Sequence, residues 1–389
     1  MSYIIDNFKI IRPSFEGNQS ECLDWLAKAH AYVRTTYETD SSKGKSLAEN
    51  VIFMRRMVEK FCCNQEKIAK RGSEIADFLH SNFSEMKIFN LVQSQFGASM
   101  QDRMKFFADS TTQVFEKFYS DIISPPADLI HVTCTGYSSP SPAQLLVSNK
   151  NWGGLCNVTN AYHMGCYASI PALRMAQGFL SQATHLKDEQ RVDIVHTELC
   201  TLHFNPSLHT AEQFVIQSLF ADGYISYSIF NKNNHVASPY KNSFEILSLQ
   251  EVIFPECHDA MTWQLSSFGF SMSISRSVPS IIAENVENFL ENMFKKAGYS
   301  FAEEKENIIF AIHPGGPKII EYIADILNLT ADKIQFSKEI LNKYGNMSSA
   351  TLPHIWEYIS GAQIRKNSLV VSLAFGPGLT IAGGVMRVL

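Results

Sequence analysis

Residues 162–174 read YHMGCYASIPALR, with Cys166 directly after a glycine. Small and apolar residues then recur at helical spacing, which predicts a buried helix over residues 166–180. The positive end of a helix favours a thiolate over a thiol, and the thiolate is the nucleophilic form of cysteine. The stretch therefore predicts a nucleophilic cysteine at the start of a buried helix.

Two further segments place polar side chains close to glycines. Residues 312–317 read IHPGGP and residues 344–350 read YGNMSSA, so that His313 and Asn346 also stand at predicted element boundaries. Cysteine, histidine and asparagine in such settings suggest an acyl-transfer site. Cys166, His313 and Asn346 are therefore the candidate catalytic residues.

Length, charge and cysteine usage exclude several classes of protein. The chain has 389 residues, enough for two domains or one large two-lobed core, and a net charge of -5 without a long basic run, which argues against nucleic acid as a partner. It has no run of about 18 apolar residues and no signal-peptide pattern at its start, so we expect a cytoplasmic protein without a membrane span. Its eight cysteines are scattered and form no CxxC pair, which predicts reduced thiols and no metal site.

Predicted helices and strands alternate along the chain, which indicates an α/β fold. The predicted helices cover residues 47–61, 101–118, 166–180, 281–294 and 318–327. The predicted strands cover residues 129–134, 192–195, 224–229, 308–312, 369–375 and 379–388, and a turn at Asp222-Gly223 is expected before the third. The first 40 or so residues remain unassigned.

An internal similarity links two of these segments. Residues 166–171, CYASIP, align with residues 348–353, SSATLP, and a helix, a strand, a glycine turn and a second strand follow each copy. We therefore predict two related halves, residues 1–235 with the cysteine and residues 236–389 with the histidine and asparagine. Their small-residue helices should meet in the centre, each kinked by its proline, Pro171 or Pro353.

The ordered set of motifs resembles the type III polyketide synthases, of the chalcone synthase and bacterial alkylpyrone or alkylresorcinol synthase kind, in the thiolase-fold superfamily. The motifs run from about residue 60 to the C-terminus. They are GC at 165–166, TELC at 197–200, LFADG at 219–223, VP at 278–279, HPGGP at 313–317, YGNMSSA at 344–350 and FGPGL at 375–379. The resemblance implies a five-layer αβαβα fold, a homodimer, and coenzyme A thioesters as substrates without a metal or redox cofactor.

The resemblance and the residue chemistry give the three candidates the same roles. Cys166 attacks an acyl thioester and holds the acyl group covalently. His313 forms an imidazolium–thiolate pair with the cysteine. His313 and the Asn346 amide then hold the enolate oxygen that forms when malonyl-CoA loses carbon dioxide. The carbanion extends the Cys166-bound acyl group, so the expected enzyme is an acyltransferase (class EC 2.3.1) that makes pyrone or resorcinol-type polyketides.

Other residues match substrate-contacting positions of the family. Phe220 matches an aromatic gatekeeper, and Met272 stands where the plant enzymes have a second one; a flexible thioether there favours an aliphatic starter. Glu198 matches a glutamate near the cavity, with a buried structural carboxylate as an equal alternative. Gly376 is expected in a tight loop under the cavity, with Gly378. The run TCTGY at 133–137 replaces a longer run that shapes ring closure in the plant enzymes, so chalcone-type closure is not expected.

The coenzyme A phosphates require a basic tunnel mouth. Lys60 and Lys318 are the candidates, with a solvated helix face as the alternative. The basic residues that cluster near the corresponding family segment are Arg55, Arg56, Lys60, Lys67, Lys70 and Arg71.

Several alternatives use similar residues. A ketoacyl synthase III-like enzyme uses the same three side chains for one condensation and takes malonyl groups from an acyl carrier protein, which makes that protein a possible partner here. A biosynthetic thiolase needs a second late cysteine, and none follows Cys257. An HMG-CoA synthase needs a glutamate base upstream of its cysteine, and we assign no residue of this chain to that role. This chain lacks the Cys-Trp pair of the papain-like proteases, which argues against that class. A non-catalytic ketosynthase subunit would usually have lost the cysteine, whereas Cys166 is present here.

Overall fold

The computed structural model describes residues 2–38, 45–182, 190–236 and 241–389. Within these ranges, no helix combines the length and the apolar character that a membrane span requires.

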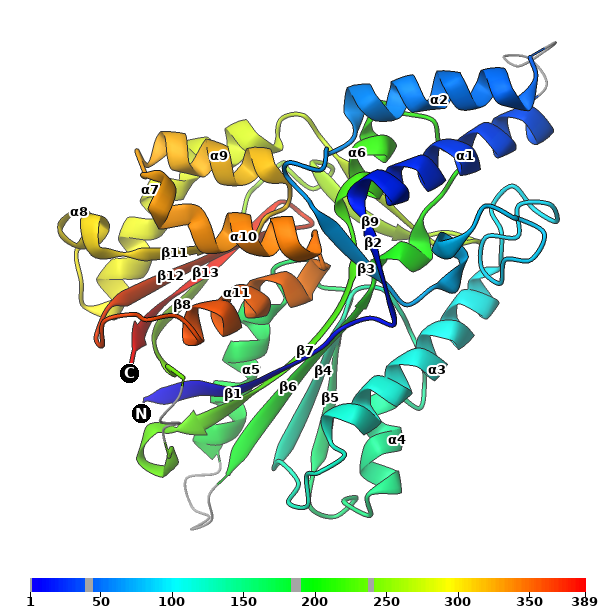
Figure 1. The fold of residues 1–389 in the computed structure, drawn as a ribbon. Helices are drawn as coiled ribbons and strands as arrows, with labels where there is room; N and C mark the ends of the chain where they lie inside the picture. Colours follow the sequence, from blue (N-terminus) through cyan, green and yellow to red (C-terminus); the bar gives the residue numbers. More distant parts are fainter. Residues whose placement is uncertain (1, 39–44, 183–189, 237–240) are drawn as a thin grey trace.

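Nine strands of the described chain form one continuous sheet in the order β11-β12-β13-β8-β1-β7-β6-β4-β5. The strand β1 joins the two parts of this sheet, because it pairs antiparallel with both β7 and β8 (Figure 1). The main-sheet strands are β1 (Tyr3–Ile11), β4 (Asp128–Thr133), β5 (Asn157–Tyr162), β6 (Arg191–Leu199), β7 (Asp222–Asn231), β8 (Phe244–Ile253), β11 (Ile309–Ile312), β12 (Leu369–Gly376) and β13 (Thr380–Val388).

Helices and two small hairpins surround this sheet. The helices are α1 (Gln19–Tyr37), α2 (Leu47–Phe61), α3 (Met100–Phe118), α4 (Pro142–Asn149), α5 (Ser169–Gln182), α6 (Ala211–Leu219), α7 (Val278–Ala297), α8 (Phe301–Glu304), α9 (Pro317–Ile326), α10 (Gln335–Tyr344) and α11 (Thr351–Ser360). One hairpin pairs β2 (Phe15–Asn18) with β3 (Lys70–Ser73), and the other pairs β9 (Met261–Leu265) with β10 (Phe270–Ile274). The β9–β10 hairpin borders the site described below.

The two parts of the sheet repeat one pairing pattern. In the first, β4 runs parallel to β6, β6 antiparallel to β7, and β7 antiparallel to β1. In the second, β11 runs parallel to β12, β12 antiparallel to β13, and β13 antiparallel to β8. This repetition agrees with the two related halves expected from the sequence. The exact division at residues 235 and 236 stays a prediction.

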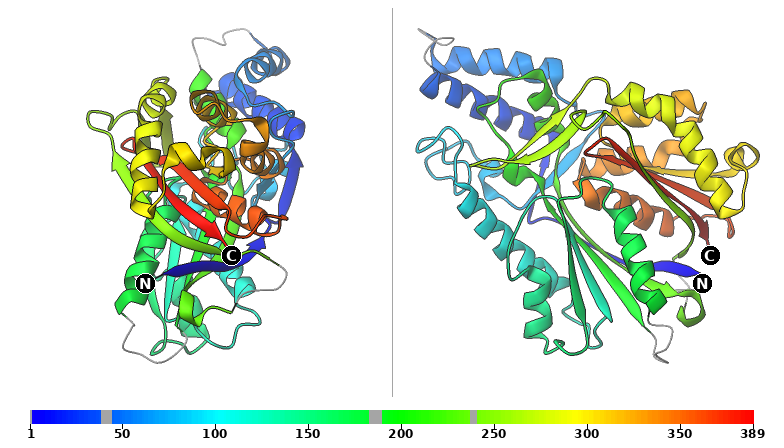
Figure 2. Two further views of the ribbon diagram at one scale, coloured as in Figure 1. Left: turned by 90° about the vertical axis from the view of Figure 1, so that its left-hand side faces the viewer. Right: turned by 180° about the vertical axis from the view of Figure 1, so that it is seen from behind.

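Helices α5 and α11 fill the space between the two parts of the sheet. Helix α5 contacts β4, β6 and β7 of the first part and β8 and β13 of the second, and α11 contacts β11, β1 and β7. The right-hand view of Figure 2 shows α5 in front of the strands. Buried residues of these two helices share one apolar core, whereas those of α3, α4, α7 and α9 belong to a second core. The layers are therefore αβαβα, as predicted.

Alternate residues of a strand face the two cores, because side chains of a β-strand point to opposite faces in turn. Along β12, Val370 and Ala374 belong to the core that α5 and α11 share. Val371 and Leu373 belong to the second core, with α3, α4, α7 and α9. Both faces of the sheet are thus buried, which explains why this strand is a continuous apolar run.

The predicted kinks in the central helices are wrong. Helices α5 and α11 begin at Ser169 and Thr351, so Pro171 and Pro353 are each the third residue of their helix. The N–H groups of a first turn have no acceptor within the helix, so a proline there removes no hydrogen bond. The same boundaries place Cys166 in the turn before α5, three residues ahead of its first residue.

Another local prediction needs correction. Asp222 and Gly223 are the first residues of β7 and form no separate turn. A Cβ atom at Gly223 would lie 2.4 Å from Met347 Sδ, so the glycine serves close packing. The unassigned N-terminal residues form β1, β2 and α1 in the structure.

Candidate active site

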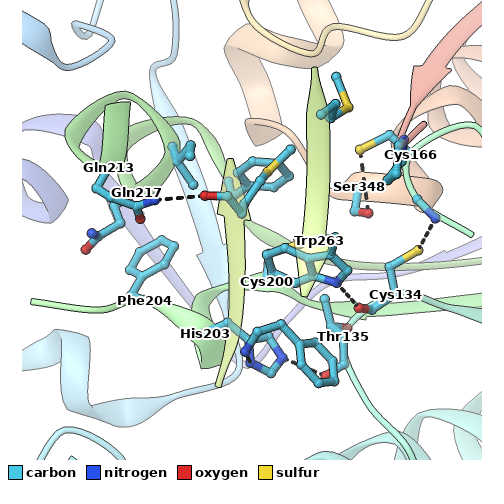
Figure 3. A pocket seen from close by; sticks show the side chains of 17 residues that line it. Cys134, Thr135, Cys166, Cys200, His203, Phe204, Gln213, Gln217, Trp263 and Ser348 are labelled. Atoms are coloured by element: carbon cyan, nitrogen blue, oxygen red, sulfur yellow. Dashed lines mark hydrogen bonds between the residues drawn. The ribbon is translucent and has the colours of Figure 1, made fainter. Parts of the chain in front are cut away.

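A small cavity adjoins Cys166 (Figure 3); we call it the cysteine chamber. Its volume is about 40 Å³. It lies between the turn before α5, the segment that follows β6, the helix α6 and the β9–β10 hairpin. The lining residues are Cys134, Thr135, Gly165, Cys166, Cys200, His203, Phe204, Gln213, Ile216, Gln217, Phe220, Met261, Trp263, Phe270, Met272, Ser348 and Pro377.

Cys166 is held by a turn that requires the preceding glycine. Gly165 has a φ of 92°, in the left-handed region, and a Cβ atom there would lie 2.3 Å from Pro377 Cδ. The Gly165 N–H donates to Cys134 Sγ at 3.1 Å. The Cys166 thiol is 8% exposed and donates to the hydroxyl oxygen of Ser348 at 3.7 Å. The thiol therefore faces the chamber from a fixed turn.

Burial sets the protonation states of the cysteine and the histidine. It raises the pKa of Cys166 to about 12, an effect that the Glu198 charge increases and the Ser348 hydroxyl opposes. Burial also lowers the pKa of His313 to about 3. Both directions favour the neutral thiol and the neutral imidazole. This contrasts with the imidazolium–thiolate pair that the sequence led us to expect.

His313 follows the last residue of β11, and its N–H donates to the Leu373 carbonyl of β12 at 2.7 Å. The side chain is 1% exposed, yet neither ring nitrogen has a hydrogen-bond partner among the described residues. The turn that follows packs on α6, because a Cβ atom at Gly316 would lie 3.4 Å from Leu219 Cδ1. His313 thus stands at the end of β11, and the turn after it reaches the end of α6.

Asn346 is held at the same end of α6. Its N–H donates to the Leu219 carbonyl at 2.9 Å, and its carbonyl accepts from the Ala221 N–H at 2.8 Å. Its side-chain Oδ1 accepts from the Ser348 N–H at 2.9 Å, while its Nδ2 has no partner in the part of the chain that the structure describes. Ser348 therefore links Asn346 to Cys166, and the structure brings the predicted cysteine and asparagine into one neighbourhood.

Unpaired polar atoms in buried positions need a physical reason, because an unsatisfied buried donor is costly. Asn346 Nδ2 and both His313 ring nitrogens are such atoms, on residues that are each 1% exposed. An oxygen acceptor within reach would satisfy Asn346 Nδ2 and the one His313 ring nitrogen that carries the proton. These two donors are therefore the candidates for an oxyanion site.

Glu198 lies beneath the chamber and is absent from its lining. It is fully buried and accepts from the Cys134 N–H at 3.0 Å, from the Thr135 hydroxyl at 2.9 Å and from the Ser349 hydroxyl. Burial raises the pKa of this carboxyl group, and these donors oppose the rise. The contacts tie residues 133–135 to the turn that carries Ser348. This is the structural alternative that the sequence left open.

Phe220 and Met272 both line the chamber, and their role as gatekeepers stays a prediction. Phe220 ends α6, and its carbonyl accepts from Arg71 Nη1 at 2.9 Å. Met272 lies on β10, and its carbonyl accepts from Gln213 Nε2 at 2.9 Å. Their backbones are thus fixed while their side chains reach the cavity.

The predicted coenzyme A contacts fall outside the chamber. Lys60 lies near the end of α2 with its Nζ 5.1 Å from the centre of the Phe61 ring, and Lys318 is an exposed residue in the first turn of α9. Arg71 does not suit a phosphate, because its guanidinium is buried and donates to Gln19 Oε1 at 2.7 Å.

Gly376 ends β12 under the cysteine turn. A Cβ atom there would lie 2.2 Å from the Tyr167 ring, so this position has no room for a side chain. Gly376 thus supports the turn and does not itself line the chamber.

An aromatic wall of the chamber was not predicted from the sequence. His203 stacks on Phe270 at 4.4 Å between ring centres, and Trp263 lies 5.7 Å from His203. The Trp263 indole N–H donates to the Cys134 carbonyl at 2.6 Å. Met261, Trp263, Phe270 and Met272 alternate along β9 and β10, and this period of two is the signal that identifies a shared face.

Among the described residues, no three His, Cys, Asp or Glu side chains gather as a metal site would require. That coenzyme A serves as substrate carrier, without any cofactor, stays a prediction.

Comparisons with known proteins give related matches. Residues 245–389 match the C-terminal domain of chalcone and stilbene synthases. The chain is 24% identical over 387 residues to type III polyketide synthase C of Arabidopsis thaliana, covering 93% of this chain and 98% of that protein. It is 29% identical over 261 residues, 67% of this chain, to probable polyketide synthase 1 of Dictyostelium discoideum, and it spans only 8% of that protein's length.

A solved structure gives a match over the whole chain. The C-terminal type III polyketide synthase domain of Steely1, a type I/III hybrid from Dictyostelium, superposes with a TM-score of 0.79 at 22% identity. The match covers 100% of this chain and 99% of that domain.

Proposed function

We propose a reaction for this chain from the premise that it is a homologue of the type III polyketide synthases, with their thiolase-like fold. The chain is an acyltransferase that condenses malonyl-CoA with a Cys166-bound acyl starter. The observation that carries the proposal is the pair of buried, unpartnered donors on His313 and Asn346, of which Asn346 is linked to Cys166 through Ser348.

The first step loads the starter. The Cys166 sulfur attacks the carbonyl carbon of an acyl-CoA, a new carbon–sulfur bond forms, and the bond to the coenzyme A sulfur breaks. The neutral His313 imidazole takes the thiol proton and returns it to the leaving coenzyme A thiolate. The imidazole is neutral at neutral pH because burial lowers its pKa to about 3, and this role requires the pKa of His313 to rise when the substrate is bound.

The second step extends the chain. Malonyl-CoA loses carbon dioxide, and the enolate oxygen that forms is held by a His313 N–H and the Asn346 Nδ2 group. The enolate carbon then attacks the Cys166 thioester, so that a carbon–carbon bond forms and the carbon–sulfur bond to Cys166 breaks. The product leaves on coenzyme A with two more carbons, and its return to Cys166 makes the enzyme iterative. Cyclisation of the longer product gives a pyrone or a resorcinol.

The starter is an aliphatic acyl group, and the lining of the chamber supports this choice. Its wall holds Met261 and Met272 with apolar and aromatic side chains, and Glu198 lies outside it. The chain acts as a homodimer, as the resemblance implies, and it does so in the cytoplasm, as we expected from its cysteines and the lack of a signal-peptide pattern. An acyl carrier protein is an alternative donor of the acyl or malonyl group.

One observation favours a second candidate function. The cysteine chamber measures about 40 Å³, whereas a cavity of about 10–15 Å³ on this measure holds one water molecule. A chamber with room for only a few waters suits a single condensation, as in a ketoacyl synthase III-like enzyme.

A product assay separates the two candidates. Purified protein is incubated with malonyl-CoA and acyl-CoA starters of increasing length, and products are identified by mass spectrometry. Cys166→Ala is the test variant, and Cys257→Ala is the matched control, because Cys257 lies outside the lining. Pyrones or resorcinols that vanish only in Cys166→Ala support the iterative synthase. A single β-ketoacyl product supports the ketoacyl synthase alternative, and no product with any starter contradicts both.

A further inference from the structure

The C-terminal end of α6 lies beside the proposed oxyanion site. The helix ends at Leu219, and Phe220 is its C-cap residue. The last carbonyl groups of a helix have no N–H partner within it, so their donors come from elsewhere. Here four carbonyls in a row, from residue 217 to residue 220, accept from donors outside the helix. The end of α6 is therefore held by other segments of the chain.

Two buried side chains from distant segments supply the donors for three of these carbonyls. Arg71 Nη1, on β3, donates to the Gln217 carbonyl at 2.7 Å and to the Phe220 carbonyl at 2.9 Å. Gln19 Nε2, on the first residue of α1, donates to the Ser218 carbonyl at 2.9 Å. Gln19 Oε1 also accepts from Arg71 Nε at 2.7 Å, so the two side chains hold each other. We call this pair the α6 clamp.

The fourth donor is the backbone of Asn346, whose side-chain amide is proposed to hold the enolate oxygen. The Asn346 N–H donates to the Leu219 carbonyl at 2.9 Å, and the Asn346 carbonyl accepts from the Ala221 N–H at 2.8 Å. These two bonds make a parallel bridge between Phe220 and Asn346. The bridge ties the Asn346 backbone to the residue whose carbonyl Arg71 holds.

Gly345 packs on the same clamp. Its φ of 74° lies in the left-handed region, which favours glycine. A Cβ atom there would lie 3.0 Å from the Leu219 carbonyl oxygen and 3.2 Å from Arg71 Cγ. The residue before Asn346 thus contacts both the end of α6 and the arginine that holds it.

The chemistry of arginine suits this position. Arg71 is 4% exposed, and its hydrogen bonds to Gln19, Gln217 and Phe220 all go to neutral oxygens. The negative end of a helix dipole favours a positive charge at its C-terminus. The planar guanidinium also offers five donors in a fixed arrangement, so that one side chain reaches acceptors on two elements. Both properties explain a buried cation at the end of α6.

We propose that Arg71 is a positioning residue of the oxyanion site. It clamps the end of α6 and, through the bridge between Phe220 and Asn346, fixes the place of the Asn346 amide. This inference rests on the proposed function, in which that amide holds the enolate oxygen. It gives a role to one of the basic residues near the expected coenzyme A segment, and this role is to hold the protein's own carbonyls in place of a phosphate.

The test is a double-mutant cycle on the decarboxylation of malonyl-CoA without a starter, measured as release of carbon dioxide. We expect Arg71→Ala to lower kcat about tenfold, which is less than the roughly 10²–10³-fold loss expected when a donor itself is removed. In the Asn346→Ala background the same substitution should lower kcat by less than about twofold, because the amide that Arg71 positions is already absent. A merely structural role would not produce this dependence on Asn346.

Arg103→Ala is the matched control. Arg103 is a second fully buried arginine, and it donates to the carbonyls of Phe96, Ala98 and Leu202, none of which belongs to α6. Urea unfolding should show lower stability in both arginine variants. The effect of Arg103→Ala on kcat, whatever its size, should be the same with and without Asn346, so that only Arg71→Ala shows the dependence.

A milder variant serves if Arg71→Ala does not fold, as judged by circular dichroism. Gln19→Ala removes one side of the α6 clamp and keeps the charge, and we expect the same dependence on Asn346 with a smaller loss of rate. Equal losses with and without Asn346, or no loss at all in a folded clamp variant, overturn this inference and leave the proposed function intact. Full decarboxylation by Asn346→Ala alone overturns the proposed oxyanion site, and this inference with it.

Discussion

The Cys166 sulfur lies 3.7 Å from the Ser348 hydroxyl oxygen, and the two residues are 182 positions apart. The same offset relates Ser169 to Thr351, the first residues of the two central helices. Cys166 and Ser348 therefore occupy equivalent turns in the two halves of the fold. These two turns face each other at the candidate site, so that each half contributes one residue to the contact between Cys166 and Ser348.

The first prediction concerns this contact. Burial raises the pKa of Cys166, and the Ser348 hydroxyl opposes that rise. Ser348→Ala removes this hydroxyl, so we expect the pKa of Cys166 to rise further. A hydrogen bond of about 1 kcal/mol corresponds to a roughly fivefold smaller thiolate fraction at a fixed pH below the pKa. Iodoacetamide labelling of the Cys166 peptide, followed by mass spectrometry across pH, measures the change.

The control for this prediction is Ser360→Ala, which removes another buried hydroxyl from α11, away from Cys166. We expect its labelling profile to match the unmodified chain. Equal labelling rates in Ser348→Ala and the unmodified chain at every pH would show that the Ser348 contact does not act on the thiol.

The turn that carries Cys166, the proposed nucleophile, could be predicted from sequence because its signals are local. Gly165, the small residues that follow it and the repeat at Ser348 all lie within two short segments. The aromatic wall could not be assembled in this way. His203 and Trp263 are 60 positions apart, and only the path of the β9–β10 hairpin over the chamber brings their rings together.

The oxyanion site gives the second prediction. His313→Ala and Asn346→Ala each remove one proposed donor, and the loss of one such donor typically lowers the rate by about 10²–10³-fold. The assay is decarboxylation of malonyl-CoA in the absence of a starter, measured as release of carbon dioxide. Acylation of Cys166 by acetyl-CoA should persist in Asn346→Ala, since this amide is proposed to act on the enolate. Full decarboxylation by both variants would rule out the proposed oxyanion site.

The third prediction concerns stability in acid. Six fully buried histidines have pKa values lowered by burial to about 3, so between pH 6.5 and 3 the unfolded chain binds more protons than the folded one. These residues are His30, His131, His196, His203, His313 and His354. The free energy of unfolding therefore falls as the pH falls through this window, by about 1.4 kcal/mol per pH unit for each proton.

Two carboxyl groups act in the opposite direction. Burial raises the pKa of Asp222 to about 7 and also raises that of Glu198, so their contributions to stability grow as the pH falls toward their ordinary values. The histidines outnumber them, which gives a net loss of stability in acid.

Urea unfolding at pH 7, 6 and 5 tests the third prediction with a single variant. The buried His354 ring has one nitrogen without a partner among the described residues, and we expect His354→Phe to reduce the pH slope by about one proton. His258→Phe is the control, because that side chain is 80% exposed. A slope that stays unchanged in His354→Phe would mean that this ring is already charged in the folded state.

The fourth prediction concerns the loop beneath the cysteine turn. Gly376→Ala places a Cβ atom 2.2 Å from the Tyr167 ring, and overpacking of this kind costs about 1–3 kcal/mol. Since Tyr167 directly follows Cys166, we expect both lower stability and slower acylation, measured by urea unfolding and by intact mass. Gly178→Ala is the control on α5, where a Cβ atom meets no neighbour within 4 Å and stability should rise slightly. Wild-type stability in Gly376→Ala would show that Tyr167 moves freely.

The N-terminal strand shows a second limit of local sequence reasoning. In β1, Tyr3, Ile4 and Ile5 are buried, but Asp6, Asn7 and Lys9 interrupt the apolar pattern. The strand is defined by its partners, since Ile5 pairs with Ile229 on β7 and with Phe244 on β8. Both partners are more than 220 positions away, so no window along the chain contains them.

The last prediction concerns the aromatic wall and the length of the product. The Trp263 indole fills one side of a chamber of about 40 Å³ and is fixed by its bond to the Cys134 carbonyl. Trp263→Ala enlarges the space for the growing chain, so we expect products with more extensions. We also expect the shortest product to be released more slowly. Trp152→Ala is the matched control, because Trp152 is buried and does not line the chamber, so it should change stability without changing product length. Product masses from the malonyl-CoA assay decide the matter: an unchanged distribution in Trp263→Ala would show that another part of the wall sets the number of extensions.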